Sequence, residues 1–341
     1  MSRRGLPGRD GRRGLAGWLV AVVLLLGGWA VQAADTFGAL TLPTPRAAPA
    51  RLVVDGRGHF WFVESDANQL GRYVETTGQF TEFAIPTRGS LPSDLQVDAG
   101  GVIWFTEQDA NQLGRFDPAT GAFKEYDIPT IRSLPVRLAI DRQGRVWFTE
   151  FYGNRLGRFD PRTETFTEYL IPTRESQPSG VVVDPAGEVW FVETLGNKLG
   201  HWNSRTEAIE EFALPTPFSA PRDLAVDRSG KLWFGARSKK QLLSFDPVGG
   251  RFEAFPLPTV GAVDALTVDG AGNIVFTIGH AGKLGVFNPG KGAFITFDAL
   301  PGESRPAGVA VDARGSVWFT DLAKNSLVKV DGEAVSQLWT R

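Results

Sequence analysis

Four glutamates recur at one position of an internal pattern, each two residues after the phenylalanine of a Trp-Phe pair. They are Glu64, Glu107, Glu150 and Glu193. Hard cations such as Mg²⁺ and Ca²⁺ prefer oxygen ligands of this kind. One hypothesis is an acidic arc that binds such an ion; the alternative is that each glutamate caps a loop or pairs with an arginine at the start of a strand.

The pattern fails in two places, and both departures introduce chemistry. Residues 235–241 read GARSKKQ, with Arg237 after the lost acid, and residues 276–282 read FTIGHAG, with His280. Asp264 occupies the position that directly follows a proline in the other copies. A free imidazole can act as an acid or a base near neutral pH, whereas an ordinary carboxylate is a weaker base. Asp264 and His280 are therefore the candidate catalytic residues, with an exposed histidine of no function as the alternative for His280.

Composition excludes several kinds of chemistry. The 341 residues include no cysteine and three histidines, so disulfides, thiol nucleophiles and cysteine-bound zinc or iron–sulfur clusters are ruled out. Sequence patterns of serine hydrolases, zinc peptidases and nucleotide-binding loops are absent as well.

A period of about 43 residues runs through the chain. An aspartate after an apolar run recurs seven times, at Asp55, Asp98, Asp141, Asp184, Asp227, Asp269 and Asp312. A Trp-Phe pair begins six residues after each aspartate except in the sixth copy, which has Val275. A fixed period of this size indicates a repeat architecture.

Each repeat contains four short runs rich in β-branched and aromatic residues. In the third copy they cover 135–141, 145–150, 155–160 and 165–172, separated by Asp, Gly, Pro and Asn turns. Seven such units predict an all-β, seven-bladed β-propeller with four antiparallel strands per blade. The repeats start near 48, 91, 134, 177, 220, 262 and 305, within a single domain of residues 34–341.

A terminal strand should close the ring and cover an otherwise exposed sheet edge. Residues 36–44, TFGALTLPT, resemble the fourth strand of the other repeats, and residues 334–340, AVSQLWT, compete for the same place. The full LPT ending favours the N-terminal segment.

Strand alternation brings the start of each first strand and the end of each second strand to one mouth of the channel. The ligand-binding candidates there are Arg51, Asp94, Arg137, Arg222, Asp223 and Arg237. We expect a monomer that binds a small molecule or a protein partner on this face.

The first 33 residues read as a signal peptide. Five arginines precede an apolar run at 18–31 that ends in small residues, and the run is short for a membrane span, although an uncleaved anchor is the alternative. Its removal changes the net charge from −2 to about −6, which disfavours nucleic acid and membrane surfaces as partners. The expected location is periplasmic or secreted, through the Sec rather than the twin-arginine pathway.

The repeats at 103–118, IWFTEQDANQLGRFDP, and 146–161, VWFTEFYGNRLGRFDP, resemble those of the streptogramin B lyases (virginiamycin B lyase). The resemblance implies a seven-bladed propeller that opens a cyclic depsipeptide by magnesium-assisted C–O elimination. It also implies a catalytic histidine directly after the proline that opens a first strand, with a glutamate nearby.

None of the seven matching positions in this chain is a histidine. They hold Ala50, Ser93, Val136, Ser179, Arg222, Asp264 and Ala307. The sequence therefore predicts a propeller that binds a ligand or partner without cleaving streptogramins. The alternative is a metal-assisted C–O lyase or lactonase-like enzyme with a non-standard base.

Overall fold

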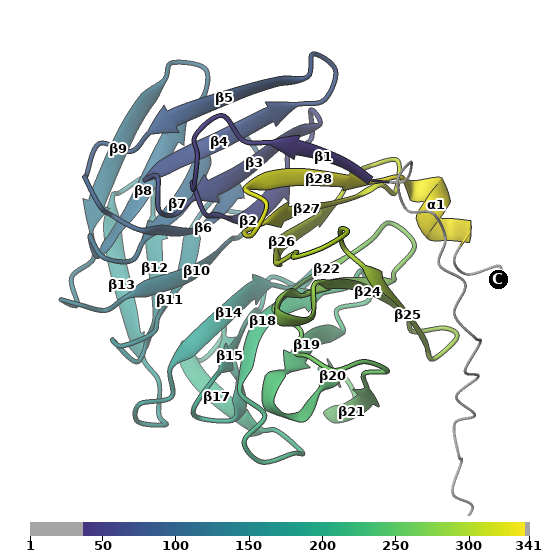
Figure 1. Ribbon diagram of the computed structural model, residues 1–341. Coiled ribbons are helices and arrows are strands. Elements are labelled where there is room, and N and C mark those ends of the chain that lie inside the picture. Colours follow the sequence, from purple (N-terminus) through teal and green to yellow (C-terminus); the bar gives the residue numbers. More distant parts are fainter. Residues whose placement is uncertain (1–36, 338–341) are drawn as a thin grey trace, which may run out of the picture. The chain divides into compact units, whose positions relative to one another are not determined.

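The computed structural model describes residues 37–337, which form seven four-stranded antiparallel sheets (Figure 1). In the first blade the strands are hydrogen-bonded in chain order: β2 (Pro49–Val54), β3 (His59–Glu64), β4 (Gln69–Val74) and β5 (Gln79–Ala84). The predicted seven-bladed β-propeller is therefore confirmed.

The next five blades repeat this order. They are β6 (Pro92–Val97), β7 (Ile103–Glu107), β8 (Gln112–Asp117) and β9 (Ala122–Asp127); β10 (Pro135–Ile140), β11 (Val146–Glu150), β12 (Arg155–Asp160) and β13 (Thr165–Leu170); β14 (Pro178–Val183), β15 (Val189–Glu193), β16 (Lys198–Asn203) and β17 (Ala208–Ala213); β18 (Pro221–Val226), β19 (Leu232–Ala236), β20 (Gln241–Asp246) and β21 (Arg251–Pro256); and β22 (Ala265–Val268), β23 (Ile274–Ile278), β24 (Lys283–Asn288) and β25 (Ala293–Asp298).

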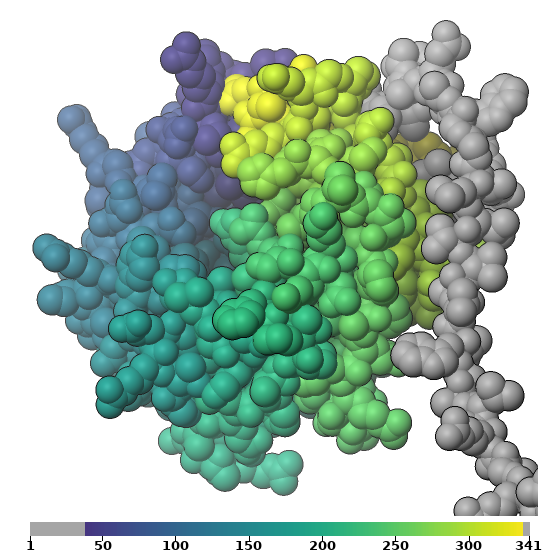
Figure 2. Space-filling view, turned by 60° about the horizontal axis from the view of Figure 1, so that its bottom comes forward, coloured from purple at the N-terminus to yellow at the C-terminus, as the bar shows by residue number. Residues whose placement is uncertain are grey.

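The seventh blade joins the two ends of the chain. Its inner strands are β26 (Pro306–Val311), β27 (Val317–Asp321) and β28 (Ser326–Val330), and its outer strand is β1 (Phe37–Thr41). The purple N-terminal strand thus lies beside the yellow C-terminal strands in Figures 1 and 2. The N-terminal strand closes the ring as predicted, and the competing segment begins instead within the short helix α1 (Gly332–Gln337).

Asparagine side chains fasten five of the seven described blades to the following loop. At the ring closure, Asn325 Oδ1 accepts the backbone N–H of Ala47 at 2.8 Å, and Asn325 Nδ2 donates to the Thr44 carbonyl at 2.9 Å. Asn68 makes the equivalent bonds to Ser90 and Thr87 in the first blade. Both asparagines have positive φ.

Tryptophans fill the spaces between blades. Trp147 packs on Trp202 of the following blade with ring centroids 4.6 Å apart, and Trp318 packs on Tyr73 at 5.8 Å across the ring closure. The indole Nε1 of Trp147 also donates to Asp141 Oδ2 at 2.9 Å, while Asp141 Oδ1 accepts backbone N–H groups of the turn. In six of the seven described repeats an aspartate therefore links a turn to an interblade tryptophan.

Tight packing within the blades also explains a glycine in the third strand. A Cβ at Gly157 would lie 2.2 Å from a ring atom of Phe148 on the neighbouring strand. The aromatic ring occupies the space above the glycine, so this position excludes a side chain.

The predicted signal peptide of residues 1–33 lies outside the described residues. Between residues 37 and 337, no helix has both the length and the apolar character that crossing a membrane demands.

Candidate functional site

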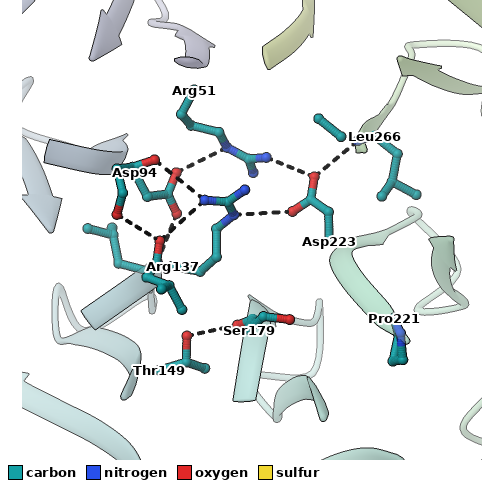
Figure 3. Close-up of polar contacts among 12 residues, drawn as sticks. Arg51, Asp94, Arg137, Thr149, Ser179, Pro221, Asp223 and Leu266 are labelled. Carbon is teal, nitrogen blue, oxygen red and sulfur yellow. Dashed lines mark hydrogen bonds and ion pairs between the residues drawn. The ribbon is translucent and has the colours of Figure 1, made fainter. Parts of the chain in front are cut away.

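A network of ion pairs crosses the centre of the ring at the starts of the innermost strands. Arg51 Nε lies 3.1 Å from Asp94 Oδ1, and Arg51 Nη1 lies 2.9 Å from Asp223 Oδ2. Arg137 Nε lies 3.6 Å from Asp223 Oδ1. Figure 3 shows the two arginines side by side between the two aspartates. These four residues come from β2, β6, β10 and β18, so the network joins blades one, two, three and five.

The two aspartates are also held by the backbone of the next blade. Asp94 Oδ2 accepts the N–H of Leu138 at 2.9 Å, and Asp223 Oδ2 accepts the N–H of Leu266 at 3.0 Å. The irregular register after Pro92 and Pro221 at the start of their strands accompanies this cross-blade contact. The carboxylates therefore fix the positions of neighbouring blades as well as those of the arginines.

Burial and charge act against one another in this network. Burial raises the pKa of Asp94 above its ordinary value, although Arg51 and Arg137 oppose the change. Burial also disfavours ionised Asp223, but the two arginines and the Leu266 N–H outweigh it and lower the pKa of this carboxyl. Against burial, Asp223 and Asp94 together raise the pKa of Arg51. Two positive and two negative groups thus balance one another.

A pocket of about 370 Å³ opens beside this network. Its ionisable lining residues are Arg51, Arg137, Arg222, Arg237, Asp264, His280 and Arg305. The sequence-predicted Arg51, Arg137, Arg222, Arg237, Asp264 and His280 are therefore brought to one pocket, whereas Asp94 and Asp223 are buried beneath two of the arginines.

Local departures of the sixth blade from the repeat shape one wall. Val263 replaces the proline that opens the other first strands, and β22 pairs with β23 without a register shift. Asp264 Oδ1 then lies 3.1 Å from Arg237 Nη2, and Asp264 Oδ2 accepts the N–H of Gly279 at 2.8 Å. The 3-10 helix η3 (Gly279–Ala281) carries the exposed His280 to the pocket.

Two arginines of the pocket have no counter-ion. Among residues 37–337, the guanidinium groups of Arg222 and Arg305 make no hydrogen bond or ion pair. Although the Arg222 side chain is exposed to the pocket, desolvation by the surrounding walls lowers its pKa, and repulsion from Arg137 and Arg237 adds to this, outweighing attraction by Asp264 and Asp223. The sequence pattern does not indicate Arg305, because an arginine precedes the strand-opening proline in the seventh repeat alone.

The four repeated glutamates do not form an arc at the mouth. Glu64, Glu107, Glu150 and Glu193 are fully buried, each within its own blade, and none lines the pocket. Three of them lie beside a serine of a neighbouring loop: Ser90, Ser133 and Ser176 act to lower the pKa of Glu107, Glu150 and Glu193, against the larger effect of burial. In blade seven, Asp321 occupies the equivalent position and accepts hydrogen bonds from the Ser304 hydroxyl and the Arg305 N–H.

Each buried glutamate faces a second glutamate in the fourth strand of its blade. Glu168, which faces Glu150, accepts the N–H and the hydroxyl of Thr130, both at 3.0 Å. Burial and then the charge of Glu168 raise the pKa of Glu150 to about 8. The same causes raise the pKa of Glu64 to about 8. Burial likewise raises the pKa of Glu193 to about 8 and that of Glu107 to about 7.

The part of the chain that the structure describes contains no cluster of three or more His, Asp or Glu side chains placed to hold a metal ion. The pocket lining offers one carboxylate, Asp264, which already faces Arg237, against five guanidinium groups. A divalent cation would meet net repulsion there, so the residues present do not fit the magnesium ion that the resemblance implies.

Together these features define a seven-bladed β-propeller with an arginine-lined pocket at one mouth of its central channel. Residues 30–245 match the sequence profile of the virginiamycin B lyase family. The chain belongs to this family, and the resemblance noted in its repeats is confirmed.

Solved structures agree with this assignment. A streptogramin B lyase structure shares 27% sequence identity, covers 86% of this chain and 97% of its own, and superposes with a TM-score of 0.82. A catalytically inactive histidine-to-alanine variant of virginiamycin B lyase from Staphylococcus aureus, with quinupristin, shares 27% identity, covers 86% and 98%, and has a TM-score of 0.81. Among curated protein sequences, none matches this chain.

Proposed function

We propose that this protein is an exported propeller of the virginiamycin B lyase family that binds a small molecule in the arginine-lined pocket and does not cleave streptogramins. The observation that carries the proposal is the pocket itself, about 370 Å³ in volume and built where the repeat symmetry fails. This volume falls within the roughly 300–1,000 Å³ of small-molecule sites. Export is supported by the basic and apolar pattern of residues 1–33.

The side chains of the pocket suit binding better than elimination. Asp264 is the carboxylate in the lining, and its two oxygens are engaged by Arg237 and by the Gly279 N–H. Accepting a substrate proton would require breaking this ion pair. At the position of the family's catalytic histidine, this chain thus has Asp264, which is ion-paired with Arg237.

A second candidate function is an elimination or lactone-opening reaction. The observation that favours it is that His280 and Asp264 line one pocket and are linked through the Gly279–His280 backbone. In that case His280 would be the proton acceptor, because its imidazole is exposed and outside the Asp264 ion pair.

The binding function is tested by filling the pocket. Ala307 lies in its lining, at the repeat position that carries the larger side chains of Arg222 and Asp264 in other blades. We expect Ala307→Trp to abolish the thermal shifts produced by compounds from a panel of anionic, neutral and cationic fragments. The matched control is Ala186→Trp, in an exposed turn between a first and a second strand. If no compound depends on Ala307, the pocket is not a ligand site.

Incubation with quinupristin separates binding from catalysis. Elimination that opens a ring leaves the mass unchanged, so the product must be followed by chromatographic retention. We expect unchanged quinupristin at high protein concentration. A new peak that disappears in His280→Ala would establish the second candidate instead.

A further inference from the structure

The unbalanced positive charge of the pocket identifies the kind of ligand it takes, and this inference rests on the proposed function. Arg51 and Arg137 are balanced by Asp94 and Asp223 beneath them. The remaining ion pair of the lining joins Arg237 and Asp264. Among the described residues, Arg222 and Arg305 are the lining arginines that take part in no ion pair. We propose that the pocket binds a small organic oxyanion, a carboxylate or a phosphate, through these two arginines.

Arg222 lies among like charges in the pocket. It follows Pro221, where the register of β18 against β19 shifts, and it is exposed within the pocket lining. Arg137 and Arg237 are close enough to disfavour its charged form. A bound oxyanion relieves this repulsion, since it supplies the missing negative charge at short range.

A third donor is available on the same side. Arg237 reaches Asp264 through Nη2, while its Nε is buried without a hydrogen-bond partner in the described structure. A buried donor that lacks an acceptor costs free energy until one is supplied. The planar guanidinium presents its N–H groups in a fork that matches two oxygens of a carboxylate or phosphate.

The rest of the lining bounds the size and character of the ligand. Leu91, Leu322 and Pro306 supply apolar surface beside the arginines. A pocket of about 370 Å³ lies at the small end of ligand sites and suits a metabolite-sized acid rather than a peptide or polymer. The acidic residues Asp298 and Glu303 belong to the lining of a neighbouring pocket instead.

The experiment measures saturable binding of two probes by the full-length protein. Benzoate represents carboxylates and phenyl phosphate represents phosphates, each titrated by calorimetry at constant ionic strength made up with chloride. Arg222→Met and Arg305→Met are compared with Arg228→Met, whose residue lines a pocket that contains turn residues of the opposite mouth. Losing one charged hydrogen bond should weaken binding about tenfold or more.

Saturable binding of either probe, weakened in Arg222→Met and Arg305→Met but not in Arg228→Met, supports the proposal, and the tighter probe identifies the oxyanion. Absence of saturation, or equal weakening in all three variants, overturns it. If neither probe binds but neutral or cationic fragments bind in a way that depends on Ala307, the proposed function stands and the oxyanion proposal is wrong. If no fragment and neither probe binds in a way that depends on Ala307, both the proposed function and the oxyanion proposal are wrong.

Discussion

Replacing Arg51 by methionine should destabilise the propeller strongly, because Arg51 forms ion pairs with both buried aspartates of the central network. The Asp94 and Asp223 side chains are 1% and 2% exposed, so water cannot replace the lost guanidinium. Removing one partner from a buried ion pair costs about 3–5 kcal/mol. Arg137 remains 3.6 Å from Asp223, which places the expected loss near the lower end, about 3 kcal/mol.

The loss should depend on pH with a definite sign. In the native protein the lowered pKa of Asp223 contributes stability above the pKa of the unfolded carboxyl, and this is lost as pH falls through the folded value. Without Arg51 the folded pKa rises and that contribution shrinks. The difference between wild type and Arg51→Met should therefore be largest near pH 7 and diminish below about pH 4, where unfolded aspartates become protonated.

Urea unfolding at several pH values measures this directly, with exposed Arg88→Met as the control. The double variant Arg51→Met/Asp94→Asn should lose less stability than the sum of its single variants, because the residues share an ion pair. A loss below about 0.5 kcal/mol for Arg51→Met at pH 7, or one that does not diminish below about pH 4, would refute the reasoning.

Three further changes test other parts of the structure. Since the pKa of Glu150 is raised to about 8, its contribution to stability is present at low pH and lost as pH rises. The melting temperature of Glu150→Gln minus that of wild type should therefore increase from pH 4 to pH 8, and a constant difference would contradict this. Gly157→Ala should cost about 1–3 kcal/mol or more in chemical denaturation because of its overlap with Phe148, whereas Gly38→Ala, whose Cβ would meet nothing within 4 Å, should be neutral. Asn325→Ala should lose about 1–3 kcal/mol from two hydrogen bonds and a left-handed conformation, and Asn325→Gly should recover only the conformational part; equal melting temperatures for all three proteins would argue against this closure.

The fold could be predicted from the sequence because each repeat carries the same local signals. Turn residues separate four strand-forming runs, and the Trp-Phe pair supplies the apolar surface that packs between sheets. The closing strand could also be predicted, since residues 37–41 retain the pattern of an outer strand. The hydrogen bond from Trp147 to Asp141 was overlooked, although their six-residue spacing recurs, because the turn alone accounted for the aspartate.

The site could be predicted less completely, because its contacts depend on how the ring brings distant blades together. Strand alternation places Arg51 and Asp223 at one mouth, but only the curvature of the ring decides that they meet across the channel. The burial of Glu150 was missed for a similar reason. Its side chain lies within the blade beside Glu168, and the sequence pattern of a second strand does not distinguish that direction from the channel.

The comparison of blades explains why the pocket lies where it does. Blades one to four each bury a glutamate at the end of the second strand, whereas blades five and six have Ala236 and Ile278 there, both buried. An apolar residue avoids the cost of burying a carboxyl group. In these two blades a 3-10 helix follows directly, and it carries Arg237 in one and His280 in the other to the pocket. The same sequence changes that remove a buried acid thus supply one pocket residue from each of the two blades. The site is therefore formed by the residues at which the repeat symmetry is lost.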